Sequence, residues 1–385
     1  YFQFYRMLGE EKVVQEGTGK EGIIIDGSIL EGGGQVLRQS VALSQLLRQP
    51  IHIHKIRAKR SKPGLAKQHL TGVKLVAEIS GGRVEGAALH SCALSFIPGE
   101  SKNSSSYTAD IQTAGSVCLL AQVALPGLLL ACANPCCVTM KGGTNAAYAP
   151  QIDYCTRVFG PTVKRYFGLN FDLQVKQRGF FPKGGGVVEL HTVPTRSIPP
   201  VCALNRGKVV SISCFVCVCG LPEVLAGRMA KAAHQALQGA GLAEEQGIRF
   251  VSEQETSKFP HGVGCVVTAT TESGCILAGS SLCGKDQKVE DAAAAAVAEL
   301  AQHLAQGGCV DEYLQDQLVV FMALACGKSA IRTGPISLHT QTAMHFAQEM
   351  TRGQVKFDVQ EDSSTSPSTF VISCQGIGYV NPHLR

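Results

Sequence analysis

Apolar runs and helix-period segments alternate along the chain from residue 23 onward. The run IIID at 23–26 is typical of a buried strand, and segments 35–47 and 65–79 repeat apolar positions every three or four residues, as amphipathic helices do. Between them, IHIHKIRA at 51–58 predicts a second strand. Strands that alternate with helices in this way predict an α/β fold.

The longest uncharged stretch, residues 111–140, resembles a membrane span in length, since about 20 apolar residues are enough to cross a bilayer. However, Gln122, Pro126 and Gly127 interrupt the stretch, and the sequence NPCC closes it like a turn. We therefore expect a buried helix followed by a strand, and no membrane segment.

The sequence pattern changes between residues 200 and 284, after the linker-like IPPVCALNRG. There we predict a compact insert with a strand at 208–219, a helix at 223–238 and strands at 248–252 and 263–278. An alanine-rich helix at 291–304 is expected to return the chain to the larger domain. The predicted organisation is a flexible extension at 1–22, a large discontinuous domain at 23–199 and 285–385, and an insert domain at 200–284.

Composition and charge narrow the possibilities only moderately. The chain has 385 residues, of which 45% are hydrophobic and 17% charged, so a folded protein is expected rather than a disordered one. A net charge of +5 permits a polyanionic partner. The 16 cysteines, without a secretory pattern, predict reduced thiols of an intracellular protein. In the densest group, strand alternation separates Cys214 from Cys217 and Cys219, which favours core packing over a zinc site.

The glycine run in LEGGGQVLR follows the first strand and precedes a helix. Glycines let the backbone approach a ligand closely, and a helix N-terminus offers unpaired N–H groups to an anion such as phosphate. Arg38 lies on the first turn of this helix and could grip phosphate oxygens. Glu31 would repel phosphate unless a divalent cation lay between them. A tight turn with an exposed ion pair is the alternative interpretation.

A basic cluster follows in KIRAKRSKPGLAKQHL. Its cations predict a surface for a polyanion, although a solvated basic face is the commoner outcome. On the predicted strand Arg57 and Lys59 would share one face, and Arg60 would begin the loop. Gln68 and His69 then begin the next helix and add hydrogen-bonding groups of the kind that position phosphate or sugar.

The main candidate for catalysis is His339, at the start of a helix in SLHTQTAMHF. A lone histidine is more often structural than catalytic, and His345 in the same segment is interpreted as structural. Upstream, Tyr313, Asp316 and Gln317 head an apolar helix and could hold a purine ring by stacking and hydrogen bonds. The alternative role for an acid at this helix start is capping, which is predicted for Asp311.

Seven blocks of the chain together resemble the RNA 3′-terminal phosphate cyclase family, in the family's order from about residue 23 to 381. They are DGSILEGGGQVLR, IRAKRSKPGLAKQHL, TAGSVCLLAQ, KGGTNAAYAPQIDY, RGFFPKGGGVVEL, DEYLQDQLVVFMALA and GPISLHTQTA. The resemblance implies a large domain of repeated βαβαββ units, with a smaller α/β domain inserted before the last repeat.

The same resemblance implies an activity: ATP-dependent conversion of an RNA 3′-terminal phosphate to a 2′,3′-cyclic phosphate. It implies that His339 becomes covalently adenylylated and that Glu31 lies at Mg²⁺ or Mn²⁺. The remaining implied site residues are, around phosphate, Arg38, Arg57, Arg60 and Gln68, and around the nucleotide, Gln122, Pro150, Tyr313, Leu314, Gln315, Asp316 and Gln317.

The expected partners are RNA with a 3′-phosphate end and ATP, with no membrane and no obligate protein partner evident. A nuclear location is implied by resemblance to animal members of the family. Two other functions stay open: a non-catalytic cyclase-like protein that serves ribosome assembly or RNA binding as a scaffold, and a transferase of the enolpyruvyl class. The segment SSLCGKDQKVEDAAAAAV departs from the family's usual connection, which leaves the docking of the insert open.

Overall fold

The computed structural model describes residues 3–7, 10–14, 22–242, 249–257, 261–364 and 367–384. Part of the predicted flexible extension lies outside these residues. The described part contains strands β1 (Gln3–Met7) and β2 (Glu10–Val14), which pair antiparallel.

Three successive units of strands and helices make up most of the chain. The first consists of β3 (Ile23–Asp26), α1 (Gly34–Leu47), β4 (Ile51–His54), α2 (Lys67–Ile79), β5 (Arg83–Glu85) and β6 (Leu94–Ile97). The second consists of β7 (Ser106–Asp110), α3 (Val117–Leu130), β8 (Cys136–Gly142), α4 (Ile152–Tyr154), the π-helix η1 (Cys155–Phe159), α5 (Gly160–Phe167), β9 (Asn170–Gln177) and β10 (Gly186–Val193). The third consists of β11 (Cys202–Ala203), α8 (Glu312–Leu324), β16 (Lys328–Thr333), α9 (Leu338–Met350), β17 (Phe357–Asp362) and β18 (Thr369–Gln375).

All three units share one topology. The sheets have the strand orders β3-β4-β6-β5, β7-β8-β10-β9 and β11-β16-β18-β17. In each, the first two strands pair in parallel and the other two pairs are antiparallel. A parallel pair needs a crossover, which a helix supplies each time. The structure thus confirms the α/β class and the repeated βαβαββ unit.

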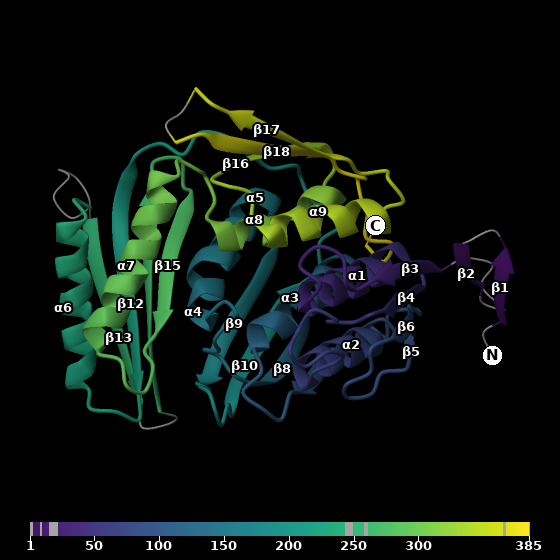
Figure 1. Cartoon of the computed structure of the whole chain (residues 1–385), viewed down its shortest axis with the longest axis horizontal. Helices are drawn as coiled ribbons and strands as arrows, with labels where there is room; N and C mark the ends of the chain where they lie inside the picture. Colours follow the sequence, from purple (N-terminus) through teal and green to yellow (C-terminus); the bar gives the residue numbers. More distant parts are fainter. Residues whose placement is uncertain are drawn as a thin grey trace.

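The helices of different units pack against one another, and the sheets lie around them (Figure 1). α1 contacts α2, α3 and α9, and α8 contacts α9 and α3. The uncharged run at 111–140 forms α3 and β8, as expected, and almost every side chain of α3 is buried. That burial explains why the run carries no charge. None of the described helices combines the length and apolar character that crossing a membrane requires.

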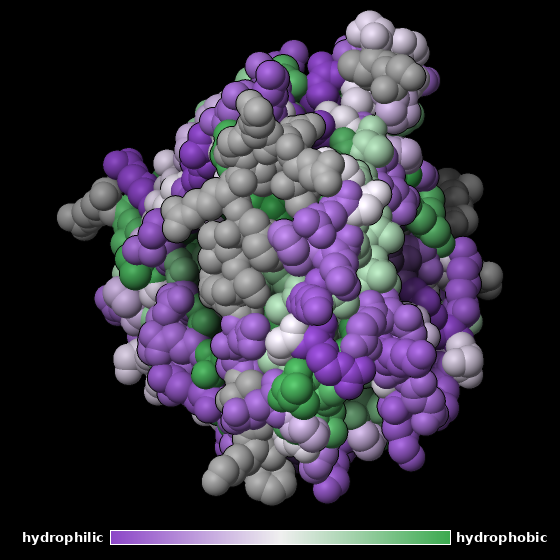
Figure 2. Space-filling model, turned by 90° about the vertical axis from the view of Figure 1, so that its left-hand side faces the viewer, coloured by the Kyte–Doolittle hydropathy of each residue, from purple (hydrophilic) through white to green (hydrophobic). Residues whose placement is uncertain are grey.

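The insert forms a fourth sheet with the order β13-β12-β14-β15. It consists of β12 (Val209–Cys219), α6 (Val224–Gly239), β13 (Arg249–Ser257), β14 (Gly262–Thr271), β15 (Ile276–Leu282) and α7 (Val289–Ala305). The insert lies at the left of Figure 1, and Figure 2 views the molecule from that side. Hydrophilic residues predominate on this face, as on an ordinary solvent-exposed surface.

Three details of the insert differ from expectation. Because β11 pairs with β16, the insertion lies after the first strand of the third unit and not before that unit. The strand expected at 263–278 is two strands joined by a turn, since Gly274 has a φ of +78°. The alanine-rich helix α7 packs mainly on β14, β15 and α6 rather than returning to the larger domain. The domain limits themselves stay a prediction.

The cysteine-rich strand behaves as its alternation predicts. Cys214 packs in the main core, with its Sγ atom 3.9 Å from that of Cys265. Cys217 and Cys219 belong instead to a small cluster with Phe180 and Phe215. Because the three thiols do not share one face, they do not form a common metal site.

Candidate active site

His339 lies in the first turn of α9, where its side chain is exposed to solvent. Ser337 caps this helix by accepting a hydrogen bond from the Thr340 backbone N–H at 3.1 Å. The Thr340 hydroxyl donates to Oε1 of Gln315 at 2.9 Å, which ties the start of α9 to α8. The helix start that carries His339 is therefore held in place while its imidazole stays accessible.

Gln35 fixes the tautomer of His339. Nε2 of Gln35 donates to Oδ2 of Asp316 at 2.7 Å, so the amide turns its Oε1 atom toward Nδ1 of His339, 2.7 Å away. An amide oxygen only accepts hydrogen bonds, so Nδ1 must carry the proton. Nε2 of His339 is then left with its lone pair free, which is the form that a nucleophile or a base requires.

Partial burial and nearby positive charges keep this imidazole neutral. Partial burial, and then the positive charges of Arg38 and Arg60, lower the pKa of His339 below its ordinary value of 6.5, while Glu312 acts weakly in the opposite direction. Burial raises the pKa of Asp316 to about 7, although Arg38 opposes the rise. The result is a neutral, oriented histidine next to two cations at neutral pH.

The glycine run lies under side chains that close over it. An ideal Cβ atom on Gly33 would lie 2.7 Å from Nη2 of Arg60 and would overlap the carboxylate of Glu31. A Cβ atom on Gly34 would lie 3.0 Å from Nη1 of Arg38 and would overlap His69. Gly32 has a φ of +60°, which favours glycine. The run therefore allows several charged groups to gather at the start of α1.

Glu31 forms an ion pair with Arg60, and only 6% of its side chain is exposed. Its other oxygen, Oε2, is buried without a hydrogen-bond partner, so one carboxylate lone pair remains available. Within the described ranges, no group of three ligating side chains includes Glu31. This fits Mg²⁺ only in the way common for nucleotide sites, in which one carboxylate and the substrate's phosphate oxygens share the ion.

The basic segment is not arranged as the sequence predicted. Strand β4 ends at His54, and residues 55–60 form turns in which Lys55 and Arg57 have φ values of +52° and +53°. The expected strand alternation of Arg57 and Lys59 is therefore wrong, because left-handed residues end the strand. Arg57 donates to the carbonyl oxygens of Lys62 and Gly64, so it shapes its own loop.

Gln68 and His69 lie at the start of α2, close to the glycine run. Oε1 of Gln68 accepts from the backbone N–H of Ser116, the N-cap of α3, at 3.1 Å. His69 is buried, and burial together with Arg38, Arg57 and Arg60 lowers its pKa to about 3. Its Nδ1 atom has no hydrogen-bond partner in the structure. Of the expected phosphate-binding residues, Arg38 and Arg60 thus lie at the start of α1. Gln68 binds the start of α3 and Arg57 binds its own loop, and the roles of all four stay predictions.

Gln122 and Gln317 meet in a cleft between α1, α3 and α8, with a hydrogen bond of 3.1 Å between them. Gln35, Arg38 and Asp316 also line this cleft, so it adjoins the Gln35 side chain that contacts His339. Its volume is about 50 Å³. Ligand pockets usually measure about 300–1,000 Å³, so the cleft does not hold a purine in this conformation.

Tyr313, Leu314 and Pro150, which were also expected around the nucleotide, do not line this cleft. Leu314 is fully buried, and the Tyr313 hydroxyl donates to Glu299 of α7. Asp311 caps α8 as predicted, by accepting from the Leu314 N–H at 2.9 Å. Pro150 lies just before α4. No hydrogen bond recorded within the described residues joins Pro150, Leu314 or Tyr313 to His339, and their roles stay predictions.

Gln35 contacts His339 at the candidate site, and the sequence did not reveal it. Its one signal was its position directly after the glycines, on the first turn of α1. His345, in contrast, pairs with Glu349 on the surface of α9 at 3.6 Å, consistent with a structural role.

The fold and the site together define a class: an α/β protein of three βαβαββ units, with an oriented neutral histidine among arginines where helices of two units meet. Comparison of the sequence with known protein families gives this class a name. A profile of the RNA 3′-terminal phosphate cyclase family matches residues 29–359, and the chain belongs to this family.

Relatives from distant organisms carry the same name. The "Probable RNA 3′-terminal phosphate cyclase" of Dictyostelium discoideum is 38% identical, covering 92% of this chain and 83% of that protein. The "RNA 3′-terminal phosphate cyclase" of Drosophila melanogaster is 36% identical, covering 93% and 97%. That of Pyrobaculum aerophilum is 38% identical, covering 92% and 98%. These matches confirm the family that the sequence blocks indicated, and with it the enzyme class.

Proposed function

We propose that this chain converts an RNA 3′-terminal phosphate to a 2′,3′-cyclic phosphate at the expense of ATP, with His339 as the temporary carrier of AMP. Membership of the cyclase family supports the overall reaction. The observation that carries the histidine step is the hydrogen bond between Nδ1 of His339 and Oε1 of Gln35, which leaves Nε2 unprotonated on a residue that is exposed to solvent.

In the first step the lone pair of Nε2 attacks the α-phosphorus of ATP. A P–N bond forms, the P–O bond to the β-phosphate breaks, and pyrophosphate leaves with the bonding electrons. The imidazole becomes positively charged, and the Gln35 oxygen at Nδ1 stabilises that charge. Arg38 and Arg60 offset the negative charge of the phosphates. Mg²⁺, held by Glu31 and phosphate oxygens, would supply further charge neutralisation.

The second step moves AMP to the RNA. An oxygen of the 3′-phosphate attacks the phosphorus on His339, the P–N bond breaks, and the imidazole regains its lone pair. The 2′-hydroxyl of the same nucleotide then attacks the activated 3′-phosphorus, loses its proton, and AMP leaves. Attacker and phosphorus belong to one nucleotide, so proximity supplies much of the acceleration. A DNA end has no 2′-hydroxyl and should stop after activation.

The two rival functions require less of His339. A ribosome-assembly scaffold has no use for an oriented, exposed imidazole, and an enolpyruvyl-type transferase would not need a histidine nucleophile. Both rivals predict no label on the protein from ATP alone. A nuclear location stays a proposal from the resemblance.

The test is incubation with ATP labelled at its α-phosphate, without RNA. The wild-type chain should retain AMP in an acid-labile bond, and His339→Asn should retain none. His345→Asn, on the same helix, is the matched control and should be labelled like wild type. Equal labelling of His339→Asn and wild type would contradict the assignment. End-group analysis of an RNA 3′-phosphate after incubation with Mg²⁺ and ATP then tests the complete reaction.

A further inference from the structure

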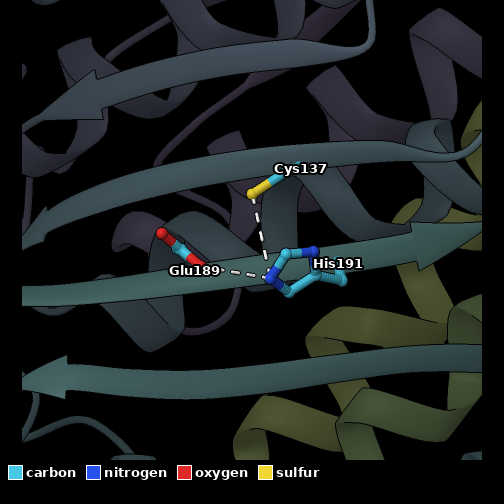
Figure 3. Close-up of side chains that lie close together, drawn as sticks. All are labelled: Cys137, Glu189 and His191. Atoms are coloured by element: carbon cyan, nitrogen blue, oxygen red, sulfur yellow. Dashed lines mark hydrogen bonds and ion pairs between the residues drawn. The ribbon is translucent and has the colours of Figure 1, made fainter.

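Three metal-ligating side chains converge on the outer face of the second unit's sheet (Figure 3). Cys137 of β8 and His191 of β10 lie directly opposite each other in antiparallel register, and Glu189 lies two residues earlier on β10. Residues two apart share a face of a strand. The Nε2 atom of His191 is 4.0 Å from Sγ of Cys137 and 3.2 Å from Oε2 of Glu189. All three side chains are partly exposed.

The spacing of these atoms suits Zn²⁺. Zinc binds sulfur at about 2.3 Å and nitrogen or oxygen at about 2.0–2.2 Å in a tetrahedron, which puts sulfur and nitrogen ligands about 3.6 Å apart and nitrogen and oxygen ligands about 3.4 Å apart. The observed 4.0 and 3.2 Å need only small side-chain rotations to match. The three ligand atoms all lie within 4.8 Å of one another, the one such group that the described residues contain.

The charges of Lys176 and Asp172 and the groove beside the cluster affect how tightly the site could bind an ion. Nζ of Lys176 lies 3.1 Å from Oε2 of Glu189 and competes with a cation for that carboxylate. A groove of about 360 Å³, lined in part by Cys137, Asp172 and His191, opens beside the cluster and has room for a water as the fourth ligand. Asp172 lies opposite His191 on β9, so a second carboxylate is nearby.

We propose that Cys137, Glu189 and His191 form a binding site for Zn²⁺, completed by a water molecule. The ion would join β8 to β10 on the face of the sheet that points away from the core. The other face of these strands packs into the core, where Val138 and Leu190 are buried. The site uses none of the groups around His339. Zinc should therefore change the stability of the sheet and leave adenylylation unchanged.

The test is titration of the reduced, metal-free full chain with Co²⁺, which stands in for Zn²⁺ and absorbs light. Wild type should show thiolate-to-cobalt charge transfer and the bands of a tetrahedral ion, saturating at one equivalent and displaced by Zn²⁺. Cys137→Ser should lose the charge-transfer band. His191→Ala should weaken binding at least about tenfold, since even the partners of metal ligands contribute about 10- to 100-fold. Lys176→Ala should bind more tightly.

Matched controls keep the outcome clear. Cys202→Ser removes an exposed cysteine on β11, and His345→Ala removes the histidine of a His–Glu pair that has no cysteine; both should bind Co²⁺ like wild type. Zn²⁺ should raise the Tm of wild type but not that of Cys137→Ser or His191→Ala. Each shift is measured from the Tm of the same protein without metal. Absence of the charge-transfer band in wild type, or its persistence in Cys137→Ser, would overturn the proposal. Labelling of His339 by ATP should be equal in Cys137→Ser and wild type.

Discussion

Gln35 donates a hydrogen bond to Asp316 at 2.7 Å across 281 positions of the chain. This bond joins the first turn of α1 to α8, and through the other end of the same amide it reaches His339 on α9. Because Oδ2 of Asp316 accepts from the Gln35 NH₂ group, the amide turns its oxygen toward the imidazole. Asp316 thus positions the histidine without touching it.

Replacing Gln35 by alanine should slow adenylylation by about 100-fold, within the range that a well-positioned proton partner contributes. Without its acceptor, Nδ1 no longer holds the proton in preference to Nε2. The measurement is the single-turnover rate of AMP transfer to the protein, at saturating ATP. Gln39→Ala is the matched control, because Gln39 also joins α1 to α9, by donating to the backbone oxygen of Ala343 at 2.6 Å. Equal rates for the two variants would show that Gln35 has only a packing role.

The adenylylation rate should stay high as the pH falls below 6.5. Since partial burial, and then the charges of Arg38 and Arg60, lower the pKa of His339, more of the nucleophile stays neutral at a pH where an ordinary histidine is half protonated. Arg60→Gln should move the acid limb of the rate profile up toward 6.5, because one opposing charge is gone. Arg228→Gln, in an ion pair on the insert, should leave the limb in place. A limb that does not move in Arg60→Gln would contradict the electrostatic account.

Asp316→Asn should change how stability depends on pH. The pKa of Asp316 is about 7 when folded and near 3.8 when unfolded, so the wild type loses stability as the pH rises between these values. Asparagine has no such loss. Relative to wild type, the variant should gain about 2–3 kcal/mol between pH 5 and pH 8, measured by urea unfolding. A difference that stays constant with pH would show that the carboxyl is not protonated in the fold.

Local periodicity predicted the α/β class, whereas the repeated βαβαββ unit was expected only from the resemblance to the cyclase family. It did not predict the insertion point, because β11 has two residues and exists only through its pairing with β16. The sequence also predicted that this strand continues to Ala58, since alternating apolar residues continue past His54 while the left-handed turn does not show in the composition. Local signals therefore predicted individual strands and helices, and tertiary pairing decided where several of them end.

The candidate site was only partly readable for the same reason. The glycine run and the basic segment are visible as residues, and the structure gathers them around the start of α1. The hydrogen bonds of Gln35 to Asp316 and His339 span 281 and 304 positions, which no local pattern encodes. Cys137 was read as part of a turn, and its approach to His191 depends on the register of β8 and β10.

Gly34→Ala should destabilise the fold and slow adenylylation. The added methyl group would overlap His69, which is 7% exposed and has little room to move. We expect a loss of about 1–3 kcal/mol, the usual range for overpacking. Gly227→Ala is the matched control: it lies within α6 with nothing near its Cβ position, so it should stabilise by about 0.5–1 kcal/mol. Urea unfolding of both variants checks the pair, and equal effects would mean that His69 moves aside.

Glu31 and Arg60 should show strong coupling in a double-mutant cycle. Arg60→Met leaves the Glu31 carboxylate, whose side chain is only 6% exposed, without its cation. We expect the free energy of unfolding to fall by about 1–3 kcal/mol. This is less than for a fully buried pair, because the Arg60 side chain is 48% exposed. Adding Glu31→Gln removes the stranded charge, so the double variant should recover more than half of that loss in urea unfolding. If the two single changes simply add, the ion pair is too solvated to matter, and Glu31 would then be free to hold a cation without first releasing Arg60.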